Sequence, residues 1–303
     1  MGDLVTAVVC TRDRPDSLQQ AVRALLQSEG VEFELIVVDQ SSGPESERAM
    51  AALSAGPRIR YVRSASRGKG AALNEGLRLA ATACTVFTDD DCEAPPDWMA
   101  GMARALEEQP TAAIVFSNVR SAPHDRSLGY IPAYERRRSR LVRSIAATCA
   151  GHGLGAGMAV RREVVLDMGG FDETFGPGAR FPSGDDWDIT HRLLLRGWHA
   201  YECATVFTVH SGFRTFAQGR AHARRDWYAI GAVCAKPLRA GYWSSIVLPA
   251  WVFTSEALWP PVLDLLKLRK PRGFTRIAAF LEGFAQGMRT PVDRQKLLFV
   301  PRA

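Results

Sequence analysis

The 303-residue sequence lacks the patterns that mark several common protein classes. Its six cysteines form no Cys-x-x-Cys pair and no Cys/His cluster at zinc spacing, so a structural zinc site is not expected. No Walker motif occurs, and no GxGxxG follows the first predicted strand, which disfavours P-loop enzymes and dinucleotide dehydrogenases. No internal repeat or low-complexity segment is present. The scattered cysteines favour the reducing cytoplasm as the location of this chain.

Long hydrophobic runs are also scarce. The start "MGDLVTAVVCTRDRP" has neither the basic residues nor the long apolar stretch of a signal peptide. The most apolar stretch, "SSIVLPAWVFTSEALWPPVLDLL", is interrupted by prolines and acids at Pro249, Glu256, Pro260, Pro261 and Asp264. A spanning helix needs about 20 mostly apolar residues, so we expect no membrane span here. A peripheral contact of the C-terminal region with the inner face of a membrane is left open.

Charge is only mildly unbalanced, with a net charge of +6. Two basic runs hold much of the excess, Tyr134–Arg143 ("YERRRSRLVR") and Lys267–Arg272 ("KLRKPR"). We expect a solvated helix face more than a phosphate or membrane contact. The first run has no interleaved aromatic residues, so nucleic-acid binding is not predicted.

Short apolar runs alternate with helical patterns in the first half of the chain. Strands are predicted at Leu4–Cys10, Phe33–Val38, Arg58–Val62, Cys84–Thr88 and Ala112–Val119, with helices from Pro15, over Ala71–Ala81 and over Asp97–Glu108. This order predicts an α/β protein with a Rossmann-like, doubly wound and mostly parallel sheet flanked by helices. Further on, we expect a strand over Ala156–Val160, a helix over Asp185–Arg196, a strand ending near His210, and helices after Gly212.

Polar side chains follow the predicted strands, where ligands bind in open α/β sheets. They are Thr11, Arg12 and Asp13 after the first strand, Asp39 after the second, Arg67 and Lys69 in the loop "SRGKG", and Asp89, Asp90 and Asp91 after the fourth. Glycines beside Arg67 and Lys69 just before a helix suit a phosphorylated ligand. Solvated cations in a helix-initiating loop would give the same pattern.

The three adjacent aspartates would repel one another without a cation. In an extended chain Asp89 and Asp91 point to one side and Asp90 to the other. Two carboxylates on one side can hold Mn²⁺ or Mg²⁺, which favour oxygen ligands and often share their coordination sphere with substrate phosphates. The alternative is an acidic cap of the following helix.

A second acidic site, "SGDDWD", places Asp185 and Asp186 in the first turn of a predicted helix. The helix dipole stabilises ionised carboxylates there, so helix capping is one explanation. An ionised carboxylate could also act as a general base on a hydroxyl group. His210 ends an apolar strand and is either an ordinary edge residue or a further metal ligand.

Taken together, six motifs resemble the family 2 glycosyltransferases of the GT-A fold. They are "VVCTRDRPDSL", "ELIVVDQSS", "SRGKGAALNEGL", "VFTDDDCEAPPDWM", "GAGMAVRREVVLDMGGFDE" and "GDDWDITHRLLLRGW", in family order. The resemblance implies a GT-A catalytic domain over residues 1–211, with a nucleotide-sugar-binding half (1–120) and an acceptor and catalytic half (121–211). Residues 212–303 would form a helical C-terminal extension.

The resemblance also implies residue roles. Donor binding would involve Thr11, Arg12, Asp13, Asp39, Arg67, Lys69, Asp89 and Asp90, with Asp39 contacting the base. Asp89 and Asp91 match the ends of the DxD motif and would be metal ligands, with Asp91 the best candidate for direct coordination and His210 as a further ligand. The cofactor would be Mn²⁺ or Mg²⁺. Asp186 would be the catalytic base, beside Asp185.

The implied reaction moves one sugar, with inversion, from a nucleoside diphosphate sugar (UDP, GDP or dTDP) to an acceptor hydroxyl on a saccharide, lipid or secondary metabolite. The QxxRW element of processive synthases is missing, which favours transfer of a single sugar. A sugar-phosphate nucleotidyltransferase and a non-catalytic nucleotide-sugar-binding protein are the alternatives.

Overall fold

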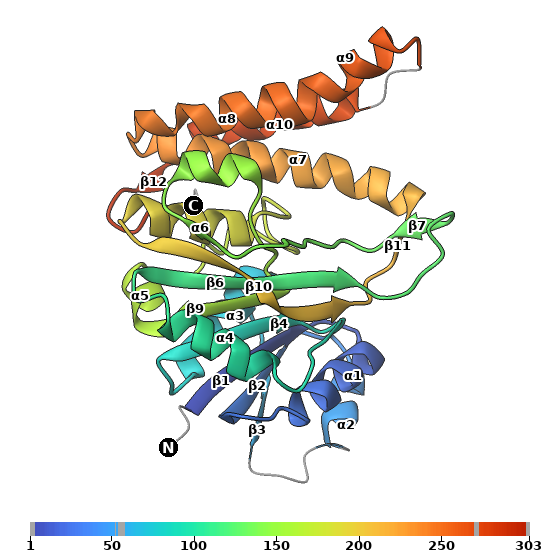
Figure 1. The fold of residues 1–303 in the computed structure, drawn as a ribbon, viewed down its shortest axis with the longest axis vertical. Coiled ribbons are helices and arrows are strands. Elements are labelled where there is room, and N and C mark those ends of the chain that lie inside the picture. The colour runs from blue at the N-terminus through green and yellow to red at the C-terminus, as the bar shows by residue number, and fades with distance from the viewer. Residues whose placement is uncertain (1–3, 52, 54–57, 270–272, 301–303) are drawn as a thin grey trace.

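A nine-stranded sheet forms the centre of the protein (Figure 1). The computed structural model describes residues 4–51, 53, 58–269 and 273–300. The sheet has the order β3-β2-β1-β4-β9-β6-β10-β5, with β8 paired to β10. Its strands are β1 (Leu4–Thr11), β2 (Glu32–Asp39), β3 (Ile59–Arg63), β4 (Cys84–Asp89), β5 (Cys92–Glu93), β6 (Ala112–Ser121), β8 (Arg140–Val142), β9 (Gly157–Arg161) and β10 (His199–His210).

The first four long strands are parallel, as the alternating pattern predicts. Cys10 of β1 is in register with Asp89 of β4, so the polar residues that follow these strands emerge at the same edge. β9 runs antiparallel between β4 and β6, whereas β10 is again parallel to β6. The sheet is therefore mixed, and the predicted α/β class is confirmed.

Helices cover both faces of the sheet because its strands are apolar on both sides. They are α1 (Pro15–Leu26), α2 (Glu45–Ala51), α3 (Lys69–Leu79), α4 (Trp98–Glu107), α5 (Arg162–Asp167), α6 (Asp185–Leu195) and the short 3₁₀ helix η1 (Ile145–Ala150). Successive residues of β1 alternate between the faces. Val8 packs with Leu73 and Leu77 of α3, and Val9 belongs to the opposite core with Leu18 of α1.

The chain after β10 is mainly helical, as expected. It forms α7 (Phe216–Arg239), η2 (Trp243–Ile246), α8 (Val247–Trp251), η3 (Val252–Leu258), α9 (Trp259–Leu266), α10 (Phe274–Arg289) and a small hairpin of β12 (Val292–Asp293) and β13 (Leu298–Phe299). α7 and α10 can pack closely because Gly283 has no side chain. A Cβ at this position would lie 1.8 Å from the carbonyl oxygen of Tyr228. Trp227 and Phe280 share a core cluster with Phe116 of β6, and the division of the chain at residue 211 stays a prediction.

The interruptions expected in the apolar stretch do not break its helix. Residues Trp243–Leu266 form one continuous helix that is long and apolar enough, by length and composition, to cross a membrane. A π-helical segment ends at Leu258, and Pro260 and Pro261 follow in the first turn of α9.

The basic run Tyr134–Arg143 is not the solvated helix face that we expected. It contains β8, and its Arg136 and Arg140 point to Glu202 of β10, with N–O distances of 3.2 and 2.7 Å. Glu202 is only 3% exposed. The run therefore neutralises a buried acid, because an unpaired carboxylate at that depth would be costly.

Candidate active site

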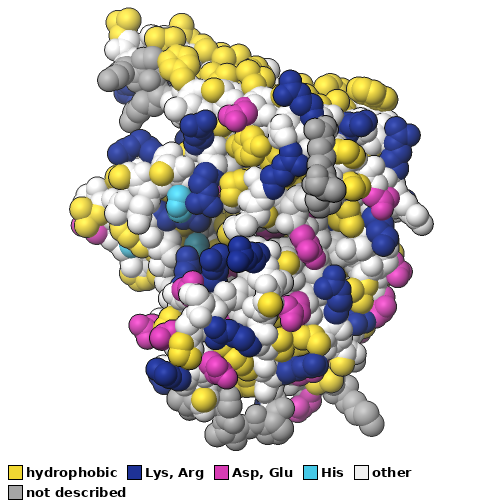
Figure 2. Space-filling view, turned by 180° about the vertical axis from the view of Figure 1, so that it is seen from behind, with side chains coloured by type: hydrophobic (Ala, Val, Ile, Leu, Met, Phe, Trp, Pro, Cys, Tyr) yellow, Lys and Arg dark blue, Asp and Glu magenta, His cyan; other side chains and the backbone are white. Residues whose placement is uncertain are grey.

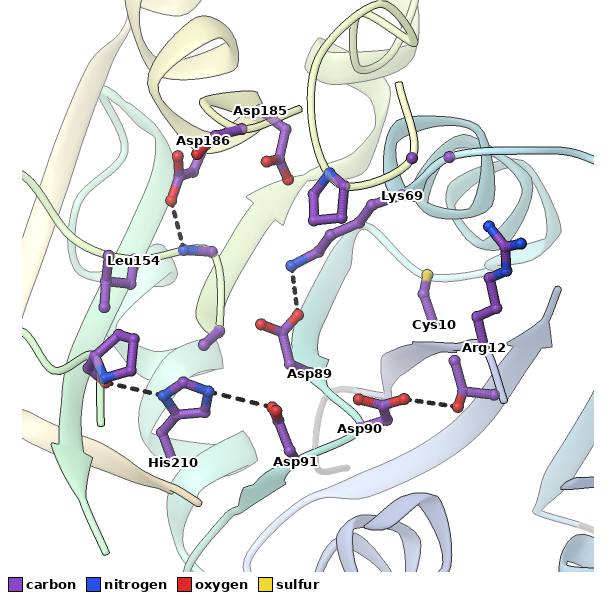
Figure 3. Close-up of a pocket in the computed structure, with 18 of the residues that line it drawn as sticks. Cys10, Arg12, Lys69, Asp89, Asp90, Asp91, Leu154, Asp185, Asp186 and His210 are labelled. Carbon is purple, nitrogen blue, oxygen red and sulfur yellow. Dashed lines mark hydrogen bonds and ion pairs between the residues drawn. The ribbon is translucent and has the colours of Figure 1, made fainter. Parts of the chain in front are cut away.

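A cleft of about 440 Å³ opens at the carboxyl ends of β1 and β4 (Figure 3). Most of the predicted site residues line it, namely Thr11, Arg12, Lys69, Asp89, Asp90, Asp91, Asp185, Asp186 and His210. They come from five separate segments of the chain. The volume is within the range of about 300 to 1,000 Å³ that is usual for ligand sites.

The three aspartates at the end of β4 have different partners. The strand ends at Asp89, and Asp90 and Asp91 lie in a turn, so the extended chain on which the predicted alternation depends stops before them. Asp89 forms an ion pair with Lys69 from the start of α3. Asp90 is buried and accepts hydrogen bonds from the Thr11 hydroxyl at 2.7 Å and from Arg14 at 3.1 Å. Asp90 therefore joins the end of β4 to the loop after β1.

The side chain of Asp91 points away from that of Asp90, toward His210. Its Oδ1 lies 3.3 Å from Nε2 of His210, and its Oδ2 accepts a hydrogen bond from Arg14 at 3.0 Å. The two residues meet because His210 of β10 is in register with Cys92 of β5, the residue after Asp91. Burial acts to raise the pKa of Asp91, but the hydrogen bond to His210 and the nearby Arg14 outweigh it and lower that pKa.

These atoms suit a divalent cation. Nδ1 of His210 lies 2.9 Å from the Pro132 carbonyl oxygen, an acceptor that fixes the ring so that Nε2 faces Asp91. A metal-bound histidine is commonly held in this way through its second nitrogen. Cys92 has its sulfur within 4.8 Å of the same atoms, but burial raises the pKa of its thiol, so it is a poor ligand for a hard cation. Asp91 and His210 would supply two protein ligands and leave room for phosphate oxygens.

The opposite wall of the cleft is the N-terminus of α6. Asp186 accepts backbone hydrogen bonds from Gly155 at 2.9 Å and from Trp187 at 2.8 Å. Gly155 lies in the loop before β9, where a Cβ would stand 3.5 Å from that of Asp186. Two amide donors hold the carboxylate in a defined orientation and leave lone pairs free toward the cleft.

Burial gives both acids on this wall an unusual proton affinity. It raises the pKa of Asp185 to about 6, because the attraction of Lys69 only partly offsets desolvation. Burial likewise raises the pKa of Asp186, against the effect of its hydrogen bond from Gly155. An acid with a raised pKa is a stronger base when ionised, which is the property that a general base requires.

The structure does not bring Asp13, Asp39 or Arg67 into the cleft. Asp39 is fully buried at the end of β2, where it accepts hydrogen bonds from the Ser41 amide and the Tyr61 hydroxyl. Asp13 instead binds Ser42, and Arg67 is exposed in the loop before α3.

Sequence reasoning missed three residues that line the cleft, Arg14, Gln40 and Arg214. Arg14 immediately precedes α1 and contacts both Asp90 and Asp91. It stands one residue beyond the polar group 11–13, so a wider window after the strand would have included it. No pattern near Arg214 of β11 (Arg214–Thr215) indicates that this distant segment returns to the site.

A buried lysine supports α6 from behind. Nζ of Lys236 in α7 lies 2.6 Å from Asp188 of α6 and 2.5 Å from Asp172, and all three side chains are at most 3% exposed. Asp172 also accepts a hydrogen bond from the Phe299 amide of β13 at 2.7 Å. The C-terminal helices are thus tied electrostatically to the helix that carries Asp186.

We expect Lys236→Met to lower the free energy of unfolding by about 3–5 kcal/mol, because buried Asp172 loses its cation and buried Asp188 keeps only the more distant Arg192, at 3.8 Å. Urea denaturation at neutral pH measures the change. Adding Asp188→Asn to Lys236→Met should restore part of the loss, and Lys296→Met, at an exposed position, is the matched control. A loss no larger than that of the control would show that Lys236 does not hold these acids.

Solved structures of known proteins share the fold of this chain. S. aureus TarS (residues 1–349) has a TM-score of 0.63 at 11% identity, covering 94% of this chain and 82% of that one. The mannosyltransferase PcManGT from Pyrobaculum calidifontis, in complex with GDP-Man and Mn²⁺, has a TM-score of 0.60 at 20% identity, covering 94% and 87%. These likenesses confirm the predicted GT-A fold.

The sequence comparisons are shorter but more specific. A stretch of 94 residues is 33% identical to the succinoglycan biosynthesis protein ExoO of Rhizobium meliloti (strain 1021), and it spans 31% of this chain and 27% of that protein. Residues 6–168 match the family described as glycosyl transferase family 2. Since this match runs from β1 to α5 and covers more than half of the chain, the protein belongs to glycosyl transferase family 2.

Proposed function

We propose that the protein transfers one sugar from a nucleoside diphosphate sugar to an acceptor hydroxyl, with metal assistance and inversion at the anomeric carbon. The observation that carries the proposal is the arrangement of the cleft. Asp91 and His210 lie on one wall, Asp186 lies on the other, and the Lys69–Asp89 pair lies between them (Figure 3). Membership of the family and relatives solved with nucleotide sugars support it.

The cationic groups would bind the diphosphate of the donor. Lys69 at the N-terminus of α3 and Arg14 beside the aspartates offer positive charge, and Arg12 and Gln40 lie at the side of the cleft formed by the loops after β1 and β2. Asp91 and His210 would hold Mn²⁺ or Mg²⁺, and the cation would neutralise charge on the leaving diphosphate.

The chain's own residues would then supply the proton transfer. Asp186, oriented by the amides of Gly155 and Trp187, would accept the proton of the acceptor hydroxyl as its oxygen forms the bond to the anomeric carbon. The bond to the diphosphate breaks on the opposite face, so the configuration inverts. Asp185 would keep Lys69 in place through its charge.

A ligand panel tests this function directly. We expect UDP, GDP or dTDP to raise the melting temperature only when Mn²⁺ or Mg²⁺ is present, because the phosphates complete the coordination. The matching nucleotide sugar should then release its nucleoside diphosphate when an acceptor is added. Release of pyrophosphate from a nucleoside triphosphate and a sugar phosphate would instead identify a nucleotidyltransferase, and binding without turnover would identify a non-catalytic protein.

The acceptor class, a saccharide, lipid or secondary metabolite, and a cytoplasmic location stay predictions.

A further inference from the structure

The long C-terminal helix exposes an unusual amount of apolar surface. Only 28% of its most apolar 18-residue window is buried, although its mean hydropathy is 1.3. We call its outer side the apolar face, which consists of Trp243, Ile246, Val247, Trp251, Leu258, Trp259, Leu265 and Leu266, each 39–70% exposed. Figure 2 shows hydrophobic side chains gathered along the end of the molecule where α8, α9 and α10 lie. Contiguous apolar surface of this kind marks an interaction site.

The opposite side of the same helix is packed against the protein. Leu248, Val252 and Ala257 are fully buried and belong to the main core cluster. Phe253 lies beside Phe280 of α10, with ring centroids 5.7 Å apart and the rings tilted by 40°. The helix is therefore held by α10 along η3 and by α7 and η1 along α8, and a partner can reach only its outer side.

The charges next to the apolar face indicate what that partner is. Directly after α9 the chain carries Lys267 and Arg269, both exposed, with no acidic residue from Leu265 to Arg269. Leu268, which lies between the two basic residues, is 96% exposed. Apolar and basic side chains interleaved in this way suit an anionic lipid surface, where the apolar groups enter the headgroup layer and the cations meet lipid phosphates.

The same features argue against a second copy of the chain. Protein interfaces are depleted of lysine, and a symmetric contact through this region would bring like charges together. Three tryptophans on one exposed helix are typical of membrane interfaces, because the indole ring is apolar with one polar edge.

The position of the apolar face relative to the cleft is also informative. In Figure 1 the free end of α9 and the ribbon of β7 (Gly129–Tyr130) and β11 lie on the side where β6 and β10 end. Exposed apolar side chains directly precede both strands, Leu128 before β7 and Phe213 before β11, whose Arg214 lines the cleft. His210 of the cleft ends β10, so this part of the cleft lies on the same side of the view as the end of α9.

We propose that the apolar face, together with Lys267 and Arg269 at its end, docks on the surface of an anionic lipid bilayer, with the helix lying along the headgroup layer. This contact does not depend on the transfer reaction. It can therefore be tested, and can fail, separately from the proposed function.

Co-sedimentation with vesicles tests the proposal. The full chain should bind vesicles of phosphatidylcholine mixed with phosphatidylglycerol more tightly than pure phosphatidylcholine vesicles, and high salt should release it. Tryptophan emission should shift to shorter wavelength on binding. We expect the double variant Trp251→Ser/Trp259→Ser to weaken binding about tenfold or more, because it removes apolar area that the bilayer would bury. Lys267→Glu/Arg269→Glu should abolish the preference for the anionic lipid.

Leu4→Ser is the matched control, since Leu4 is 50% exposed in β1, outside the apolar face. Circular dichroism of each variant reports whether it is folded. Equal vesicle binding by the wild type and both double variants would overturn the proposal. So would a dimer, seen by light scattering, that the tryptophan variant dissolves without any vesicle binding. Retention of membrane-bound protein after alkaline carbonate extraction would also overturn it, because that result indicates a spanning helix.

Discussion

Asp186→Asn should reduce sugar transfer by about 10²- to 10⁴-fold while donor binding is retained. Asparagine has nearly the same shape, so it can keep one of the two amide contacts from Gly155 and Trp187, but it cannot accept a proton. Single-turnover kinetics with saturating donor measure the rate, and the melting-temperature shift with nucleoside diphosphate and Mn²⁺ measures binding. Asp185→Asn, which makes the same change at the adjacent acid, is the matched comparison. Full activity of Asp186→Asn would show that Asp186 is not the base.

The pH dependence of the wild type provides the control for this experiment. Because burial raises the pKa of Asp186, its ionised fraction falls on acidification at a higher pH than for an ordinary aspartate, for which the pKa is about 3.9. Transfer should therefore decline as the pH is lowered toward that raised pKa, and the residual activity of Asp186→Asn should lack this limb.

Ionisation of Asp186 should lower the stability of the folded protein, whereas it raises activity. A raised pKa means that the folded state favours the protonated acid, so ionisation of Asp186 costs stability above its folded pKa and not below the unfolded value. At about pH 8 the Asp186→Asn variant, without ligand, should melt at the same temperature as the wild type or higher. A lower melting temperature would mean that the loss of activity reflects damage to the fold.

Asp91→Asn should abolish the metal-dependent stabilisation by nucleoside diphosphate. A ligand at 100 times its Kd contributes about 2.7 kcal/mol to the stability of the folded state, so the expected loss is large. The physical reason is that Asp91 is the ionised partner of His210 and the carboxylate best placed for a cation. Thermal shifts over a Mn²⁺ titration, with and without nucleotide, measure the effect.

Two further variants make this result specific. Asp167→Asn, on the exposed side of α5, changes the same charge away from the cleft and should leave the shift unchanged. His210→Gln should weaken the Mn²⁺ dependence without removing it, because Asp91 remains. An unchanged Mn²⁺ dependence in Asp91→Asn would show that the cation, if it binds, is held elsewhere.

Local patterns in the sequence were sufficient for the elements that build the cleft. The strand before Asp89, the helix that begins at Asp185 and the strand that ends at His210 were all predicted within one or two residues. Their periodicity is a property of neighbouring residues, and the edge where parallel strands end follows from the βαβ connection.

Other features depended on residues distant in sequence. Asp39 faces the interior because Tyr61 on the neighbouring strand donates a hydrogen bond to it. The basic run 134–143 faces inward because its Arg136 and Arg140 pair with Glu202 of β10. The prolines between 243 and 266 are expected to break a helix. The structure instead places a π-helical segment directly before Pro260 and Pro261, which no sequence pattern indicates.

The order of strands and helices, the acidic and basic groups at their ends and the resemblance to a family of transferases all follow from local patterns in the sequence. That Asp91 meets His210, that Lys236 lies between Asp172 and Asp188, and that one face of the C-terminal helix is left uncovered are visible only in the folded chain. The reason is that propensity and periodicity act over a few residues, whereas charge pairing and burial are set by segments that approach one another only when the chain is folded.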